Sequence, residues 1–274
     1  MSGMSAEFFT PQERELSDRF LSDGYIVLPV EDRDALDWIR GRISDLAAAH
    51  LGLDAVENVG EFLNTLHTRI KHENLNELRL VVIQGLNAED ELRARNFALV
   101  RQALQTLVGS ELSMQRRMNL SIQMPSDGSS LLPFHSDVLN GDSPFEVVHW
   151  TPFVDVFRTK SMFLLPPDKN KEALRRLSEF ETKGNEALRK EFEEDFIWLD
   201  VRYGETVLFN QNLFHGNIIN IENETRWTMN CRYKGVFTPY ADKKLGEFFA
   251  PITLRPASRI GMSYELPEGF ESDN

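Results

Sequence analysis

Cysteine is almost absent from this chain of 274 residues, which contains only Cys231. An intramolecular disulfide is therefore excluded, which fits a reducing compartment, and we expect Cys231 to serve in packing. No apolar run approaches the roughly 20 residues of a transmembrane helix. The start of the chain, Met1 to Phe9, lacks the basic residues and apolar stretch of a secretory signal. These absences predict a soluble cytoplasmic protein with no membrane partner.

Basic residues are also scarce, with 30 Lys and Arg against 43 Asp and Glu and a net charge of −13. A nucleic-acid partner would demand Lys and Arg for its phosphates, so this charge argues against one. Hydrophobic residues make up 41% of the chain and include 19 Phe, enough for a sizeable core with bulky packing. The sequence leaves a homo-oligomer open.

The first part of the chain has the pattern of helices. Thr10 to Glu13 offers an N-cap, a proline at the first helical position and a capping glutamate, and Asp23-Gly24 ends the predicted helix. A short strand is predicted from Tyr25 to Leu28, and an amphipathic helix from Asp32 to Leu51. Residues 58–112 read as helical but less regular, with a break predicted at Gly85-Leu86-Asn87.

The second part changes to the two-residue repeat of strands. Apolar and polar residues alternate from Met118 to Met124, and a charged helical insert over about 166–195 interrupts the strands, either as a lid or as decoration of a connection. A strand or a strand pair is predicted at 145–157, and further strands at 160–165, 196–201, 206–209 and 226–234. Helices followed by short strands indicate one α+β domain over residues 1–274, with a helical part at about 10–112 and a sandwich or jelly-roll core at about 115–240.

A candidate metal site stands in the strand-rich part. His135 and Asp137 are two residues apart, so an extended backbone points both side chains to the same face. With His215 they would form the two-histidine, one-carboxylate triad of non-haem Fe(II) oxygenases. A His-x-Asp pattern alone could equally be a surface turn. His149 lies in an apolar run and is expected in the core, and His50, His67 and His72 are expected at helix surfaces or ends.

The last predicted strand adds independent information. Arg226, Thr228, Asn230, Arg232 and Lys234 alternate with largely apolar residues, so one face is wholly polar. This face could lie in water, or it could turn toward the barrel mouth, where Arg226 would pair with a dicarboxylate and Thr228 would add a hydroxyl group. The position of Arg226, eleven residues after His215, favours the second interpretation. Arg232 is the alternative anchor.

With these residues in view, the chain resembles the Fe(II)/2-oxoglutarate-dependent oxygenase superfamily. The segment from Phe20 to Pro29 is similar to the start of the phytanoyl-CoA hydroxylase-like branch. Three further blocks resemble oxygenases of carbohydrate-biosynthesis clusters, including the streptomycin-cluster type. The blocks are His135-Ser136-Asp137 with Gly141 to Val148, Thr159 to Met162, and His215-Gly216-Asn217 through Arg226 to Arg232.

The resemblance implies a double-stranded β-helix in which His135, Asp137 and His215 hold Fe(II). It implies that 2-oxoglutarate chelates the iron and that Arg226 holds its distal carboxylate, assisted by Thr228. Further contributors to this pocket are Gln123 and Asn119, and weaker candidates are Lys160 and Asn217.

The implied reaction consumes O2, converts 2-oxoglutarate to succinate and CO2, and oxidises a small molecule, with hydroxylation favoured over halogenation because Asp137 is present. A sugar, an aminocyclitol or a related metabolite is the substrate suggested by the family. Polar residues after the triad could hydrogen-bond a polyol or satisfy their own loop; they are Asn140, Asp142, Ser143 and Glu146. The alternatives are a cupin-like metal enzyme that does not use 2-oxoglutarate, and a catalytically silent sugar-binding relative.

Overall fold

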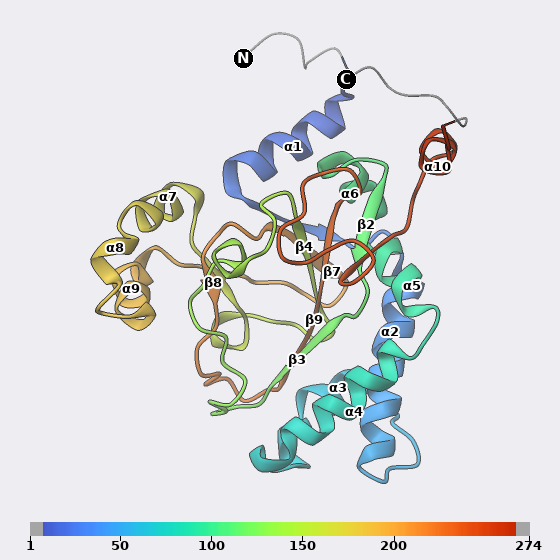
Figure 1. Ribbon diagram of the computed structural model, residues 1–274. Helices are drawn as coiled ribbons and strands as arrows, with labels where there is room; N and C mark the ends of the chain where they lie inside the picture. Colours follow the sequence, from blue (N-terminus) through green and yellow to red (C-terminus); the bar gives the residue numbers. More distant parts are fainter. Residues whose placement is uncertain (1–7, 267–274) are drawn as a thin grey trace.

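Two β-sheets lie at the centre of the computed structural model, which describes residues 8–266 (Figure 1). The larger sheet has the strand order β1-β7-β4-β9-β2-β10, with β3 also paired to β9, and the smaller one has the order β6-β5-β8. The strands are β1 (Tyr25–Pro29), β2 (Leu112–Gln115), β3 (Asn119–Gln123), β4 (Val147–Pro152), β5 (Phe163–Leu164), β6 (Ile197–Trp198), β7 (Glu205–Asn210), β8 (His215–Gly216), β9 (Arg226–Gly235) and β10 (Phe249–Pro251). Neighbouring strands are antiparallel, and with the flanking helices they confirm the predicted α+β class.

The helices come mainly from the first part of the chain. They are α1 (Pro11–Asp23), α2 (Arg33–His50), α3 (Val59–Asn64), α4 (Leu75–Asn87), α5 (Leu92–Ala98), α6 (Arg101–Leu107), α7 (Pro167–Arg175), α8 (Leu177–Phe180), α9 (Asn185–Glu191) and α10 (Pro256–Met262). Helix α1 has the predicted capping box, because the Thr10 hydroxyl accepts from the Glu13 amide and the Glu13 carboxylate accepts from the Thr10 amide. Gly24 ends this helix at φ 76°.

The break predicted at Gly85-Leu86-Asn87 is confirmed at its last residue, because α4 ends at Asn87 and α5 begins at Leu92. A Cβ atom at Gly85 would lie 2.6 Å from a methyl carbon of Leu46. The glycine therefore allows α2 and α4 to approach each other closely, and it does not end the helix. Both helices cover the sheet on the side of β3 (Figure 1).

Several strands are shorter than predicted. The strand predicted at 145–157 is formed only over β4, and that at 160–165 only over β5, after a 3-10 turn at Arg158–Lys160. Likewise, only Ile197–Trp198 of the predicted 196–201 strand pairs as β6. Phe153 and Val156 lie between strands yet are fully buried. In these segments, the apolar runs correctly indicated which residues are buried, but they did not indicate where each strand begins and ends.

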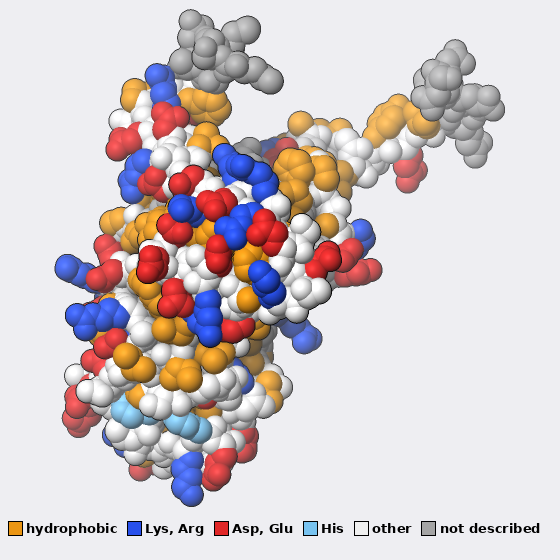
Figure 2. Space-filling view, turned by 90° about the vertical axis from the view of Figure 1, so that its left-hand side faces the viewer, with side chains coloured by type: hydrophobic (Ala, Val, Ile, Leu, Met, Phe, Trp, Pro, Cys, Tyr) orange, Lys and Arg blue, Asp and Glu red, His pale blue; other side chains and the backbone are white. Residues whose placement is uncertain are grey.

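The charged insert forms α7, α8 and α9. Its apolar side packs in a second cluster with residues next to the predicted metal ligands, including Phe134 and Phe214. Its outer face carries interleaved acidic and basic side chains (Figure 2). Ion pairs within the insert include those of Arg176 with Glu179 and Glu191. The insert therefore packs against the smaller sheet and supports it.

Strand β10 pairs with β2, and Ile252 packs against the main core. Residues 1–7, which include most of the segment judged to lack a secretory signal, lie outside the described part. Within residues 8–266, no helix is long and apolar enough to cross a membrane.

Candidate metal centre

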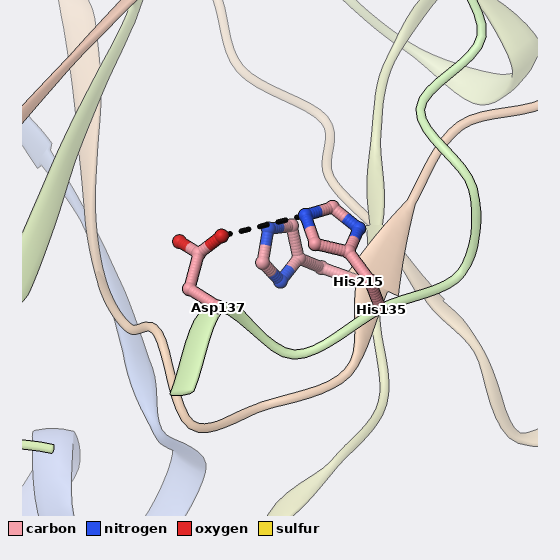
Figure 3. Close-up of side chains that lie close together, drawn as sticks. All are labelled: His135, Asp137 and His215. Atoms are coloured by element: carbon pink, nitrogen blue, oxygen red, sulfur yellow. Dashed lines mark ion pairs between the residues drawn. The ribbon is translucent and has the colours of Figure 1, made fainter. Parts of the chain in front are cut away.

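The three predicted metal ligands converge on one point between the two sheets (Figure 3). His215 lies on β8, and its backbone exchanges two hydrogen bonds with that of His135, at N–O distances of 3.0 and 2.8 Å. Ser136 is extended, with φ −113° and ψ 131°. His135 and Asp137 therefore point to the same side, although Asp137 already begins a 3-10 turn.

The geometry of these three side chains suits a metal ion. One ligand atom from each lies within 4.8 Å of the others, and His135 Nε2 is 3.4 Å from Asp137 Oδ1. Within the described range 8–266, no other group of three or more His, Cys, Asp and Glu side chains is close enough to hold a metal. The arrangement offers two imidazoles and one carboxylate with room for other ligands.

Backbone carbonyl groups fix both imidazoles. His135 Nδ1 lies 2.6 Å from the Pro133 oxygen, and His215 Nδ1 lies 2.9 Å from the Leu213 oxygen. Each Nδ1 therefore carries the proton, and each Nε2 is left with a free lone pair. Burial and the neighbouring His135 lower the pKa of His215 to about 4, so this ring is neutral at pH 7.

Asp137 is oriented by Arg232 and is kept ionised by its neighbours. Burial opposes its ionisation, but hydrogen bonds and charges from His135, His215 and Arg232 outweigh burial and hold its pKa well below the usual value. Arg232 donates from Nη2 to Asp137 Oδ2 at 2.8 Å. The other carboxylate oxygen, Oδ1, is the one that faces His135, so the carboxylate presents one oxygen to the metal position.

The ligands open into a cavity of about 420 Å³ lined by residues of both sheets. Its apolar wall includes Trp150, Met162 and Phe209. Gly216 lies at its edge, where a Cβ atom would come within 3.2 Å of the Leu132 carbonyl oxygen. A larger residue would push apart the two segments that carry His135 and His215.

Arg226 lies in the same cavity at the start of β9. Its Nη1 donates to the Ser161 carbonyl at 3.0 Å, and its Nη2 donates to the Ser121 hydroxyl at 3.1 Å. Its buried Nε has no hydrogen-bond partner among the described residues. Burial lowers the pKa of Arg226 to about 10, partly offset by Asp127. This is a buried cation with unused donors, which is costly unless an anion binds there.

The polar face of β9 lies toward the cavity and not in water, as the second of the two interpretations predicted. Thr228, Asn230 and Arg232 line the cavity with Arg226, while Lys234 donates to the carbonyl groups of residues 238 and 239 instead. The opposite face of β9 packs in the core.

The remaining predicted residues divide into two groups. Asn119 and Asn217 line the cavity. Gln123 lies behind it and donates to the Ile218 carbonyl while accepting from Asn217. Lys160 is buried away from the cavity, with its amine 2.5 Å from a Glu224 carboxylate oxygen.

Polar residues after the triad form hydrogen bonds and ion pairs within their loop and with residues 239–243, and not with the cavity. Asp142 pairs with Lys243, the Ser143 hydroxyl donates to the Pro239 carbonyl, and Glu146 accepts from the Ser143 amide. None of these residues, nor any residue of the insert, is among those that line the cavity. The structure therefore favours the loop interpretation for them, and it does not place the insert as a lid on this cavity.

His149 is a core residue, as predicted. It is fully buried, and its ring nitrogens lie within hydrogen-bond distance of Thr206, Thr151 and Asn96. Burial lowers its pKa to about 3. Cys231 is buried and unpaired, which confirms its role in packing.

The cavity also contains residues that sequence reasoning missed. Arg79, Ser121 and Trp150 line it. The alternation of β3 could have found Ser121, which faces Thr228 across the strand pair. Arg79 comes from α4, and nothing in the sequence showed that this helix lies beside the site.

Comparisons with solved structures give the same architecture. SnoK, described as a non-haem alpha ketoglutarate dependent carbocyclase from nogalamycin biosynthesis, matches with a TM-score of 0.54 and 16% identity over 92% of this chain and 100% of SnoK. HygX from Streptomyces hygroscopicus, solved with nickel and 2-oxoglutarate, matches with a TM-score of 0.51 and 15% identity over 86% of this chain and 90% of HygX. The non-haem monooxygenase ThoJ, as a nickel complex, matches with a TM-score of 0.53 and 14% identity over 85% of this chain and 82% of ThoJ.

The chain has the fold of these oxygenases. This confirms the predicted double-stranded β-helix with N-terminal helices. No protein-family model and no curated protein matches the sequence.

Proposed function

We propose that the protein is a non-haem Fe(II)- and 2-oxoglutarate-dependent dioxygenase that hydroxylates a small polar molecule, with the whole chain acting as one oxygenase domain. The observation that carries this proposal is a buried arginine with unused donors, Arg226, in the same cavity as a fixed His-Asp-His triad. The neighbours SnoK, HygX and ThoJ support it through their fold.

The three donors fit Fe(II). Both histidines are held with Nδ1 at a backbone carbonyl, and Asp137 stays ionised and His215 neutral at neutral pH, so these two ligands have no proton to lose before the metal binds. The pKa of His135 is raised, because hydrogen bonds to Asp137 and Pro133 outweigh its burial, so metal binding there competes with a proton. Two nitrogen donors and one oxygen donor suit a divalent iron and leave positions open on it. We propose His135, Asp137 and His215 as the metal ligands.

Arg226 fits the distal carboxylate of 2-oxoglutarate. A carboxylate at its free donors would neutralise the buried charge and could accept two parallel hydrogen bonds. Thr228 lines the cavity beside it and can add a hydroxyl group. Asn119 is a further contact from β3, whereas Gln123 acts indirectly, by orienting Asn217.

Iron with 2-oxoglutarate supplies the activation of O2 that hydroxylates a carbon centre. The protein's residues bind and orient the reactants and exclude water. Arg226 fixes the far end of the cosubstrate, the carbonyl groups of Pro133 and Leu213 fix the histidine rings, and the apolar wall limits water access.

We further propose a sugar or a sugar-derived metabolite of carbohydrate or natural-product biosynthesis as the substrate, and a place in the phytanoyl-CoA hydroxylase-like branch near the streptomycin-cluster type. The sequence blocks around the triad support this. A structure of HygX holds hygromycin B together with nickel and 2-oxoglutarate, which supports a small-molecule substrate.

An anaerobic titration with Fe(II) and then 2-oxoglutarate tests the proposal, with the visible metal-to-ligand charge-transfer band as the signal. We expect a band in the wild type, none in Asp137→Ala, and a much weaker affinity for 2-oxoglutarate in Arg226→Ala. Arg175→Ala, an exposed residue on α7, is the matched control. Bound metal without any band would reject the 2-oxoglutarate mechanism and favour the cupin-like alternative. A band without succinate formation under O2 would favour the catalytically silent relative.

A further inference from the structure

Arg79 brings a third arginine into the cavity, from outside the two sheets. Helix α4 lies along β3, and hydrogen bonds from the end of α4 and from the 3-10 turn before it (His72–Asn74) reach the chain at the two ends of that strand. Asn87 exchanges hydrogen bonds with the Met118 backbone at 2.8 and 3.1 Å, and the His72 ring lies 3.1 Å from the Pro125 carbonyl oxygen. Arg79 lies between these two attachments and is half-buried.

The position of Arg79 on α4 is unusual for a charged residue. The buried face of this helix is formed by Leu75, Leu78, Val82 and Leu86. Arg79 is four residues after Leu75 and three before Val82, so it shares their side of the helix. An apolar residue or alanine would be expected there if the position served packing alone.

The residues that line the cavity include more basic than acidic side chains. Its lining includes Arg79, Arg226 and Arg232, but Asp137 is the only acidic residue. Arg232 is already paired with Asp137 and lies 3.8 Å from Asp142. Arg79 makes one side-chain hydrogen bond, from Nη2 to the neutral Asn76 oxygen at 2.7 Å, and forms no ion pair within residues 8–266.

This imbalance is notable in a chain of net charge −13. If 2-oxoglutarate occupies Arg226, as the proposed function requires, Arg79 is the cation left without a counterion. An arginine fork suits phosphate and carboxylate groups equally well. Asn230, on β9, lines the same cavity, and its side-chain amide can donate to such an anion.

We propose that Arg79, with Asn230, binds an anionic group of the substrate, a phosphate or a carboxylate. The substrate is then an acidic or phosphorylated small molecule, whose anion is held at α4 while the carbon to be oxidised lies at the metal. This inference rests on the proposed function, because it assigns Arg226 to 2-oxoglutarate.

The test measures anion binding in the full-length protein loaded with Mn(II) and saturated with 2-oxoglutarate. Inorganic phosphate is titrated, and the paramagnetic enhancement of its phosphorus NMR relaxation reports binding near the metal. Acetate is titrated in parallel by carbon NMR. Saturable enhancement by phosphate alone assigns a phosphate ester, by acetate alone a carboxylate, and by both a site for either group.

Variants then assign the anion to Arg79. We expect Arg79→Met to weaken anion affinity by about tenfold or more, because it removes a charge-assisted hydrogen bond. Arg79→Lys should keep part of the affinity, and Arg175→Met, which removes an equal charge from α7, should have no effect. All three variants should retain the affinity of the wild type for 2-oxoglutarate.

Three results would overturn the inference. Anion binding unchanged in Arg79→Met would mean that the anion ligates the metal or another residue. No saturable enhancement with either anion would mean that the cavity has no such site. Loss of 2-oxoglutarate affinity in Arg79→Met would place Arg79 in the cosubstrate site. Failure of the wild type to form the Fe(II)/2-oxoglutarate band is a separate result, and it would reject the proposed function itself.

Discussion

Arg232 links the metal position to the loop behind it. Its guanidinium contacts Asp137 at 2.8 Å and approaches Asp142, which in turn pairs with Lys243. Neighbouring charges raise the pKa of Arg232 despite its burial, so it is a permanent cation beside the proposed metal ligand Asp137. The sequence leaves Arg232 open as an alternative anchor for 2-oxoglutarate, and its ion pair with Asp137 favours Arg226 for the proposed anchor.

Replacing Arg232 with Met should lower metal affinity by about 10- to 100-fold, the usual effect of losing a residue that orients a metal ligand. Competition with a chelator measures this affinity. Arg176→Met, which breaks exposed ion pairs on the insert, should bind metal as the wild type does. Unchanged metal affinity in Arg232→Met would contradict the assigned role.

His149 should make the protein acid-sensitive. Its pKa falls from 6.5 to about 3 on folding, so the folded state binds fewer protons than the unfolded state between these values. Its contribution is therefore present above pH 6.5 and is lost as the pH falls toward 3. Between pH 7 and pH 5 the loss is about 2 kcal/mol.

Urea unfolding at pH 7 and pH 5 checks this contribution. His149→Gln keeps a hydrogen-bonding side chain but cannot titrate, so its free energy of unfolding should fall by about 2 kcal/mol less than that of the wild type over this range. An equal fall in both proteins would show that His149 does not carry the effect. His67→Gln, a partly buried histidine bonded to Thr225, serves as the control.

At the scale of elements, the insert supports β8. Asn170 on α7 accepts from the Phe214 amide at 2.7 Å and donates to the Asn212 carbonyl at 3.1 Å. These bonds fix the backbone just before His215. The lid interpretation assumed that a long insert covers the mouth of the barrel, but the aromatic cluster of Phe134, Phe163 and Phe214 holds it against the smaller sheet.

Asn170→Ala should therefore affect stability and metal binding together. The buried Phe214 amide would lose its partner, at a cost of about 1–3 kcal/mol, and His215 would be less well fixed. Chemical unfolding and a metal titration measure the two effects. Asn185→Ala, at the exposed start of α9, should change neither stability nor metal affinity. A metal affinity unchanged in Asn170→Ala would show that the insert does not help to position His215.

For the whole molecule, metal binding should add stability because the triad joins segments far apart in the sequence. His135 and His215 belong to separate segments of the chain, which meet only in the folded state. With Fe(II) at about 100 times its dissociation constant, the free energy of unfolding should rise by about 2.7 kcal/mol.

Thermal unfolding under anaerobic conditions, with and without Fe(II), measures this gain. Removal of the metal with a chelator should reverse it, and Asp137→Ala should show no gain. A similar gain in Asp137→Ala would show that the metal stabilises the protein at another place.

The sequence by itself determined local features that depend on near neighbours. The capping box at Thr10 and Glu13, the left-handed Gly24 and the alternation of β9 follow from backbone geometry and side-chain type within a few residues. The triad was also readable, because few arrangements other than a metal site bring such residues together with a later arginine.

Only the tertiary structure decided what depends on contacts between distant segments. It placed Arg79 beside the cavity through α4, paired Arg232 with Asp137, and turned the loop after the triad toward Lys243. It also set the ends of the strands, because buried apolar residues occur in loops as well as in sheets. Periodicity reports which face of an element is buried, but packing alone determines which other element covers that face.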